Sequence, residues 1–134
     1  MKRRSLIILL LLALTANLFA QGPIQQRKVP KDFSYPEASE IVQVDLTSRS
    51  LGGVVRVPNG EDLADALVER VSSDWKNRLD ATFTDSEGRF KLSSLPDGNY
   101  FLRVSKSGFC TLRIKLRLKR KAKSEMDLEL PLGI

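Results

Sequence analysis

Residues 84–104 hold two glycine turns, and a short run of alternating apolar and polar residues follows each of them. The first turn is Asp85-Ser86-Glu87-Gly88 and the second is Pro96-Asp97-Gly98. Gly88 suits the left-handed position that follows a type I turn, so the first turn predicts a hairpin between its flanking strands. Alternation with a period of two is typical of half-buried strands. This stretch therefore predicts a fold of short strands joined by tight turns.

Similar runs on both sides extend the pattern. Gly53, within the run 51–57, marks a place where another backbone can approach closely. Residues 61–71 fit a helical period, and residues 67–71 within them also fit a strand with a bulge. We favour a loop followed by a strand because the neighbouring runs are strands. The other strands are expected at residues 40–46, 79–84, 90–92, 100–104, 110–119 and 126–130.

The alternation is longest in residues 110–119, where it fixes the register of the strand. Cys110 falls on the inward face of this strand and is therefore expected to be a buried side chain rather than a reactive thiol. About seven strands, spaced roughly ten residues apart with turn signals between them, indicate an all-β sandwich. The fold class expected for residues 40–134 is a seven-stranded antiparallel Greek-key β-sandwich.

The first 20 residues have the composition of a secretion signal. Lys2, Arg3 and Arg4 precede an apolar run at residues 6–14 that is too short to span a bilayer. We predict a signal peptide at residues 1–20, cleaved after Ala20, and a mature protein in the periplasm or outside the cell. An uncleaved N-terminal anchor is the alternative.

Residues 21–39 contain three prolines, many polar residues and no hydrophobic period. This composition predicts a flexible linker because it offers little apolar surface to bury. In the alternative, Phe33 and Tyr35 dock on the domain that follows.

The chain has no histidine and one cysteine. It therefore lacks the general base of Ser-His-Asp and Cys-His enzymes and the imidazole ligand of many zinc sites. It cannot form an internal disulfide. Asp85, Glu87 and Asp97 have oxygens that suit calcium, but turn formation alone explains them. We expect no catalytic residue, no metal and no cofactor.

The 22 basic residues exceed the 16 acidic ones, but three of the basic residues leave with the signal. The remaining excess does not by itself indicate nucleic-acid binding. Seven basic residues are concentrated within residues 113–123: Arg113, Lys115, Arg117, Lys119, Arg120, Lys121 and Lys123.

On the outer face of a strand, alternate cations would stand about 7 Å apart and could bind an anionic polymer or lipid headgroups. The alternative is a solvated face that discourages edge pairing and is neutralised by Asp127 and Glu129 of the last strand. Trp75, in a polar loop, is a second candidate contact. It would either stack on a sugar or partner, or cover one end of the sandwich.

Several motifs together resemble the carboxypeptidase regulatory-like domain. They are LGGVV at residues 51–55, ALV at 66–68, TDSEGRF at 84–90, LPDGNYFLRV at 95–104 and GF at 108–109. The resemblance covers about residues 50–131 and implies a transthyretin-like, or prealbumin-type, sandwich. It also implies a noncatalytic module of secreted or cell-envelope proteins, in a fold often grouped with carbohydrate-binding sandwiches.

The expected function is a secreted or periplasmic noncatalytic module that binds a protein or an envelope polymer, of which an anionic glycan is one. Contact with a membrane surface is compatible with the basic residues. The alternatives are a carbohydrate-binding module, with Trp75 and the basic residues as contacts, and an accessory domain of a secreted hydrolase.

Overall fold

The computed structural model describes residues 22–133, so the predicted signal peptide lies outside the described residues. Within this range the chain forms eight β-strands and no helix. In chain order the strands are β1 (Ile41–Ser48), β2 (Gly52–Arg56), β3 (Leu67–Val71), β4 (Arg78–Phe83), β5 (Arg89–Lys91), β6 (Gly98–Ser105), β7 (Thr111–Leu118) and β8 (Met126–Glu129).

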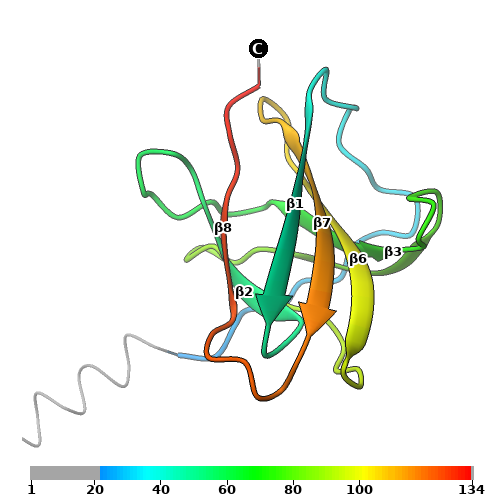
Figure 1. Cartoon of the computed structure of the whole chain (residues 1–134). Helices are drawn as coiled ribbons and strands as arrows, with labels where there is room; N and C mark the ends of the chain where they lie inside the picture. The colour runs from blue at the N-terminus through cyan, green and yellow to red at the C-terminus, as the bar shows by residue number, and fades with distance from the viewer. Residues whose placement is uncertain (1–21, 134) are drawn as a thin grey trace, which may run out of the picture.

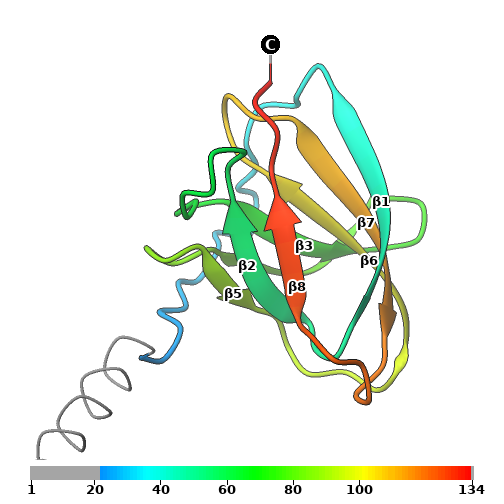
Figure 2. The same ribbon diagram turned by 60° about the vertical axis from the view of Figure 1, so that its left-hand side comes forward.

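The strands form two sheets that pack face to face (Figures 1 and 2). The larger sheet has the order β1-β7-β6-β3-β4, and the smaller sheet has the order β5-β2-β8. The all-β sandwich expected from the sequence is thus confirmed. Residues 67–71, for which a strand was favoured over a helix, form β3, which pairs with β4 on one side and β6 on the other.

The eight strands correspond to the eight runs expected from the sequence, although the expected fold class was a seven-stranded sandwich. The expectation of a wholly antiparallel sandwich was wrong, because two of the strand pairs are parallel. β1 lies parallel to β7 in the larger sheet, and β2 lies parallel to β8 in the smaller one. The β1–β2 and β7–β8 connections both cross between the sheets side by side, joined by a 3.0 Å hydrogen bond from Arg49 N to Ser124 O. Alternation shows which face a residue occupies, but it does not show which strand is its neighbour.

The turn at residues 85–88 does not close a hairpin, although its local geometry is as expected. Gly88 has a φ of 75°, and its N–H donates to Asp85 O at 3.0 Å. However, β4 pairs with β3 in the larger sheet, whereas β5 pairs with β2 in the smaller sheet. The turn therefore carries the chain from one sheet to the other.

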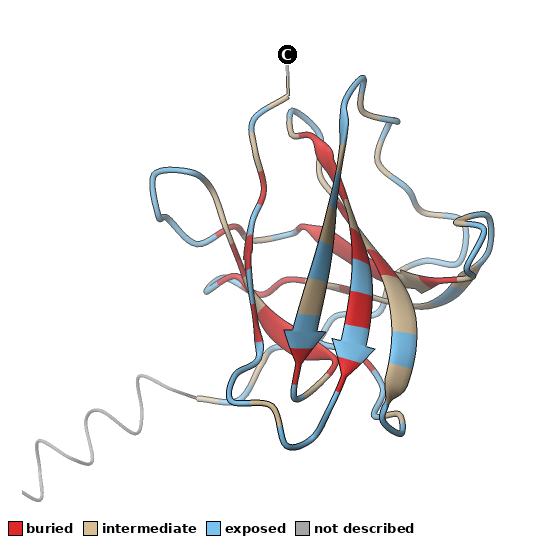
Figure 3. Cartoon of the chain, viewed as in Figure 1, coloured by how far each residue is buried: buried red, intermediate tan, exposed pale blue. Residues whose placement is uncertain are grey.

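The core fills the space between the sheets (Figure 3). On β7 the inward side chains alternate with exposed ones, as the sequence predicted. The fully buried aromatic is Phe90 on β5. Apolar residues at the centre of the core include Val55, Val68, Leu102, Val104, Ile114, Leu116, Leu128 and Leu130.

Residues 22–38, which we call the N-terminal strap, run against the domain as an irregular segment with a turn at residues 31–32. Phe33 packs edge-to-face on Phe83 of β4, with ring centroids 5.3 Å apart. The Tyr35 hydroxyl donates to Asp65 O at 2.6 Å, and the Arg78 guanidinium donates to the carbonyl of Phe33. These contacts correspond to the alternative in which Phe33 and Tyr35 dock on the domain.

The strap explains why the sequence of β3 showed no clear period. Leu67 and Val71 point to the outer face of the larger sheet, yet both are buried. Phe83, the register partner of Leu67, is covered by Phe33 of the strap. A strand that is covered on both faces has apolar residues on both, so its pattern does not alternate.

Candidate functional site

The outer face of the larger sheet carries three basic side chains along β7. Arg113, Lys115 and Arg117 alternate with the buried Leu112, Ile114 and Leu116, and so point away from the core. Lys115 and Arg117 are exposed and Arg113 is half-buried. We call these three residues the β7 cation row. The other predicted cations, Lys119, Arg120, Lys121 and Lys123, lie beyond the end of β7 in the connection to β8.

The predicted neutralisation of this row by Asp127 and Glu129 was wrong, because β8 lies in the other sheet. Asp127 instead pairs with Arg56 at 3.0 Å. Across the sheet, Lys115 has Asp45 of β1 and Phe101 of β6 as its register partners. Within residues 22–133 no carboxylate oxygen lies within 4.0 Å of a nitrogen of the β7 cation row.

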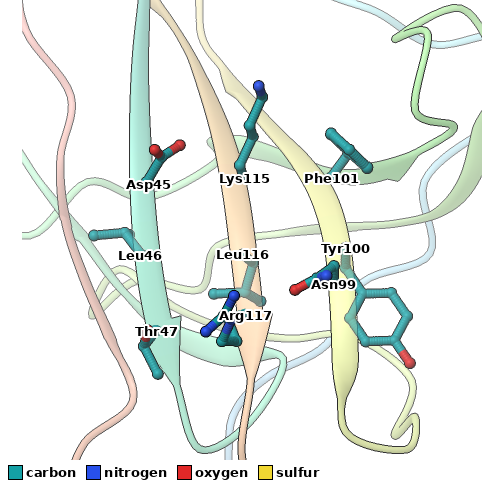
Figure 4. A pocket seen from close by; sticks show the side chains of 9 residues that line it. All are labelled: Asp45, Leu46, Thr47, Asn99, Tyr100, Phe101, Lys115, Leu116 and Arg117. Atoms are coloured by element: carbon teal, nitrogen blue, oxygen red, sulfur yellow. The ribbon is translucent and has the colours of Figure 1, made fainter.

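A shallow groove of about 440 Å³ follows the lower part of the row (Figure 4). Lys115 and Arg117 stand on its middle strand. On either side of them lie Asp45 and Thr47 of β1, and Asn99 and Phe101 of β6. The groove thus combines two cations, neither of them within 4.0 Å of a described carboxylate oxygen, with the Asp45 carboxylate, an amide, a hydroxyl and an aromatic ring.

Trp75 lies on this same face and not at one end of the sandwich. Its ring packs edge-to-face on Phe101, with centroids 5.4 Å apart. The Arg113 guanidinium lies over the indole, 5.0 Å from its centroid. A tight loop holds Trp75 at a φ of 67°. The indole is therefore part of the surface that supports Arg113, which does not match a free platform for stacking sugars.

The loop around Trp75 is fixed by Asp74, whose Oδ1 accepts hydrogen bonds from the Ser72 hydroxyl and from Lys76 N. These two bonds lower the pKa of Asp74 below its ordinary value. The Arg103 guanidinium adds a 3.0 Å hydrogen bond to Trp75 O. The position of the indole is thus set from both sides of the loop.

A buried carboxylate lies beside the row. Glu69 of β3 is 2% exposed, and its oxygens accept hydrogen bonds from Arg78 Nε at 2.8 Å and Arg103 Nε at 3.0 Å. Burying a carboxylate is costly unless it is paired, and here two guanidinium groups share it. Both oxygens are therefore already engaged, Oε1 by Arg103 of β6 and Oε2 by Arg103 and by Arg78 of β4.

Above the groove, a smaller cavity of about 190 Å³ lies between the strap and the sheet. Its walls include Tyr35 and Glu37 of the strap and Arg103, Thr111 and Arg113 of the sheet. Burial first, and then the Asp65 carboxylate, raise the pKa of Tyr35, so its hydroxyl stays protonated at neutral pH.

The family model of the carboxypeptidase regulatory-like domain matches residues 50–131. The chain belongs to this family. Domains of the carboxypeptidase regulatory-like family are typically noncatalytic modules with a transthyretin-like β-sandwich, which is the fold described above. Comparison with curated protein sequences gave no match.

In the turn of the TDSEGRF motif, the aspartate side chain accepts hydrogen bonds from the backbone of the turn. Asp85 Oδ1 accepts the backbone N–H of Glu87 and of Arg89, each at 2.9 Å. Asp97 accepts the N–H of Arg120 at 3.1 Å. Within residues 22–133 no group of three acidic or cysteine side chains comes together to hold a metal ion.

Cys110 is buried, as the alternation predicted. Burial raises the pKa of its thiol, and the nearby Glu40 carboxylate raises it further. A high thiol pKa leaves little thiolate at neutral pH, and the thiolate is the reactive form.

In the part of the chain that the structure describes, no helix is long and apolar enough to cross a membrane.

The residues that sequence reasoning missed are those whose place depends on strand pairing. Asp45, Asn99 and Phe101 line the groove only because β1 and β6 flank β7. One sequence signal could have identified Phe101. It is an apolar residue at an outward position of its strand, which indicates a covered or functional surface.

Proposed function

We propose that this carboxypeptidase regulatory-like domain is an exported, noncatalytic module that binds an acidic partner along the outer face of its larger sheet. The partner is a protein or an envelope polymer with repeated negative charges. The observation that supports this most directly is the β7 cation row, whose three cations have no carboxylate partners within residues 22–133.

The contrast with other arginines of the domain strengthens the proposal. Arg56, Arg78, Arg89 and Arg103 each lie within 4.0 Å of at least one carboxylate oxygen. Arg113 and Arg117 do not, and neither do Arg49, Arg70 and Arg120. What distinguishes Arg113 and Arg117 is the face around them, which contains a polar groove and an aromatic ring. The Arg113 guanidinium already rests on the Trp75 ring, so Arg113 loses less conformational entropy than a free side chain when a negative partner binds.

An acidic glycan is the form of the carbohydrate-binding alternative that agrees best with this face. The Arg113 guanidinium covers the Trp75 indole, so recognition by stacking of a neutral sugar on Trp75 is not favoured. Cations spaced about 7 Å apart along a strand suit carboxylate or phosphate groups repeated along an extended polymer.

Export is supported by the first 20 residues, with a basic start and an apolar run. We expect the protein recovered from the periplasm or medium to begin at Gln21, as measured by its intact mass. A protein that retains Met1 and stays with the membrane fraction would favour the anchor alternative.

The binding face is tested by photo-crosslinking in the native cell. A photoreactive residue at Thr47 or Asn99 lies in the groove, whereas one at Lys91 or Glu129 lies on strands of the smaller sheet. All four positions are exposed. We expect a crosslinked partner from the first two positions and none from the other two.

A charge-reversal pair then tests the electrostatics. Lys115→Glu with Arg117→Glu should remove the crosslink at Asn99 and leave the fold intact, because both side chains are exposed. Lys28→Glu with Lys31→Glu on the strap changes the net charge equally and serves as the control. If the two charge-reversal pairs gave equal crosslinking, or if the positions on both sheets gave equal crosslinking yields, the β7 cation row would be only a solvated face.

A further inference from the structure

The cavity between the strap and the larger sheet has the composition of a site for one small anion. It encloses about 190 Å³, which is below the usual range of pockets for drug-sized ligands. One wall is formed by the strap from Ser34 to Glu37, and the other by residues of β3, β6 and β7. A space of this size is large enough for a single charged group.

Arg113 is the residue in this cavity whose charge is not balanced. Its Nε is buried and has no hydrogen-bond partner in residues 22–133. Its guanidinium rests on Trp75, so its plane is held by an aromatic surface rather than by an acceptor. Buried donors are usually satisfied, and one that is not marks either strain or a missing ligand.

The neighbouring charges cannot satisfy Arg113. Arg103 is its register partner on β6, so two cations face each other across the strands. Like charges in that position are destabilising. The Glu69 carboxylate compensates Arg103 and Arg78.

Glu37, the second acidic residue in the cavity wall, is exposed and makes no ion pair with Arg113. It therefore leaves the charge of Arg113 uncompensated.

We propose that this cavity binds one carboxylate group of the partner, with Arg113 as its anchor. The planar guanidinium of Arg113, which lines the cavity, matches a carboxylate in a two-point contact. Ser105 and Thr111, which also line the cavity, bring hydroxyl donors to the same site. The partner would thus place one acidic group under the strap and the following ones along Lys115 and Arg117.

This inference rests on the proposed function for the identity of the partner, but the anion site itself can be tested without the partner. Acetate is the probe, titrated at constant ionic strength against chloride, while the side-chain Nε–Hε resonance of Arg113 is followed by NMR. We expect a saturable shift with acetate and none with chloride. Sulfate and phosphate are titrated separately, and either of them binding tenfold more tightly than acetate would overturn the assignment to a carboxylate.

The variants separate a built site from general charge attraction. Arg113→Gln should weaken acetate binding about tenfold or more, since a charged hydrogen-bonding partner is lost. In that variant the response is read from the backbone amides of Ser105 and Thr111. Arg113→Lys keeps the charge but not the planar fork, so it should weaken acetate binding less than Arg113→Gln does. This second variant keeps the proposal testable if Arg113→Gln does not fold.

Arg117→Gln, two residues along the same strand and outside this cavity, should bind acetate as the wild type does. No saturable shift at Arg113, or equal weakening by Arg113→Gln and Arg117→Gln, would overturn the proposal. Acetate binding with no crosslinked partner would instead disprove the proposed function and leave the anion site standing.

Discussion

The backbone of Gly53 on β2 lies so close to Met126 on β8 that a Cβ at position 53 would stand 2.1 Å from the Met126 carbonyl oxygen. This contact joins the central strand of the smaller sheet, β2, to the parallel edge strand β8. It also confirms what the glycine at this position predicted, namely the close approach of another backbone.

Gly53→Ala should therefore be strongly destabilising, because the added methyl meets a backbone atom that can move only if the strands separate. We expect a loss of about 2–3 kcal/mol in the free energy of unfolding, measured by denaturant titration. Gly98→Ala is the control: its Cβ would meet only the Tyr100 side chain, at 3.6 Å or more. Equal losses in the two variants would show that the approach of β8 to β2 is not as close as described.

Glu69→Gln should lower stability by about 2–3 kcal/mol, since it leaves two guanidinium groups with a neutral partner in a buried position. We place the value below the range for fully buried pairs because the Arg78 and Arg103 side chains are 21% and 25% exposed. Glu87→Gln removes a carboxylate that is 51% exposed and should change stability by less than about 0.5 kcal/mol. Denaturant midpoints that move equally would contradict the central role of Glu69.

The contact between Arg113 and Trp75 should be measurable as a coupling energy. In a double-mutant cycle, Trp75→Ala with Arg113→Gln should show a coupling of about 0.5–1 kcal/mol, as for a partly exposed cation over an indole. The matched cycle with Arg117→Gln should give a value near zero, because Arg117 makes no such contact with Trp75. Circular dichroism is the appropriate probe, since Trp75 is the only tryptophan and its fluorescence is lost in the variant.

Much of the fold was available from the sequence because strands such as β7 and β8 have one buried face. The alternation in β7 predicted its inward residues, and the glycine in the turn at 85–88 predicted a left-handed backbone at Gly88. Strand pairing was not available, because it depends on contacts between distant residues. β4 and β5 were expected to form a hairpin, yet the chain crosses between the sheets at that turn.

The candidate site was predictable only in part, for the same reason. The cations of β7 were evident from their spacing, but their neighbours were not: Asp127 was expected beside them and instead lies in the other sheet, paired with Arg56. The contribution of the strap could not be inferred from its composition, which resembles that of a linker. Phe33 packs on Phe83 of β4, and hydrogen bonds made by Tyr35 and Arg78 add to the contacts that hold the strap.

Asp85 should make the stability of this domain sensitive to acid. Burial by itself raises the pKa of this carboxyl, but hydrogen bonds from the backbone N–H groups of Arg89, Glu87 and Gln25, together with the Arg89 charge, lower it below the ordinary value. A carboxyl with a lowered pKa in the folded state stabilises the fold above the unfolded pKa of about 3.9. That stabilisation is lost as the pH falls from about 4 through the lower, folded-state pKa.

Asp85→Asn should therefore be less stable than the wild type at pH 7 and should lose less stability between about pH 4 and pH 2. Denaturant titrations at a series of pH values give both quantities. Asp45→Asn, an exposed position on β1, is the control and should keep the acid sensitivity of the wild type. If Asp85→Asn also kept it in full, the turn at 85–88 would not be the origin of the acid response, and the hydrogen bonds at Asp85 would contribute little to the energy of the fold.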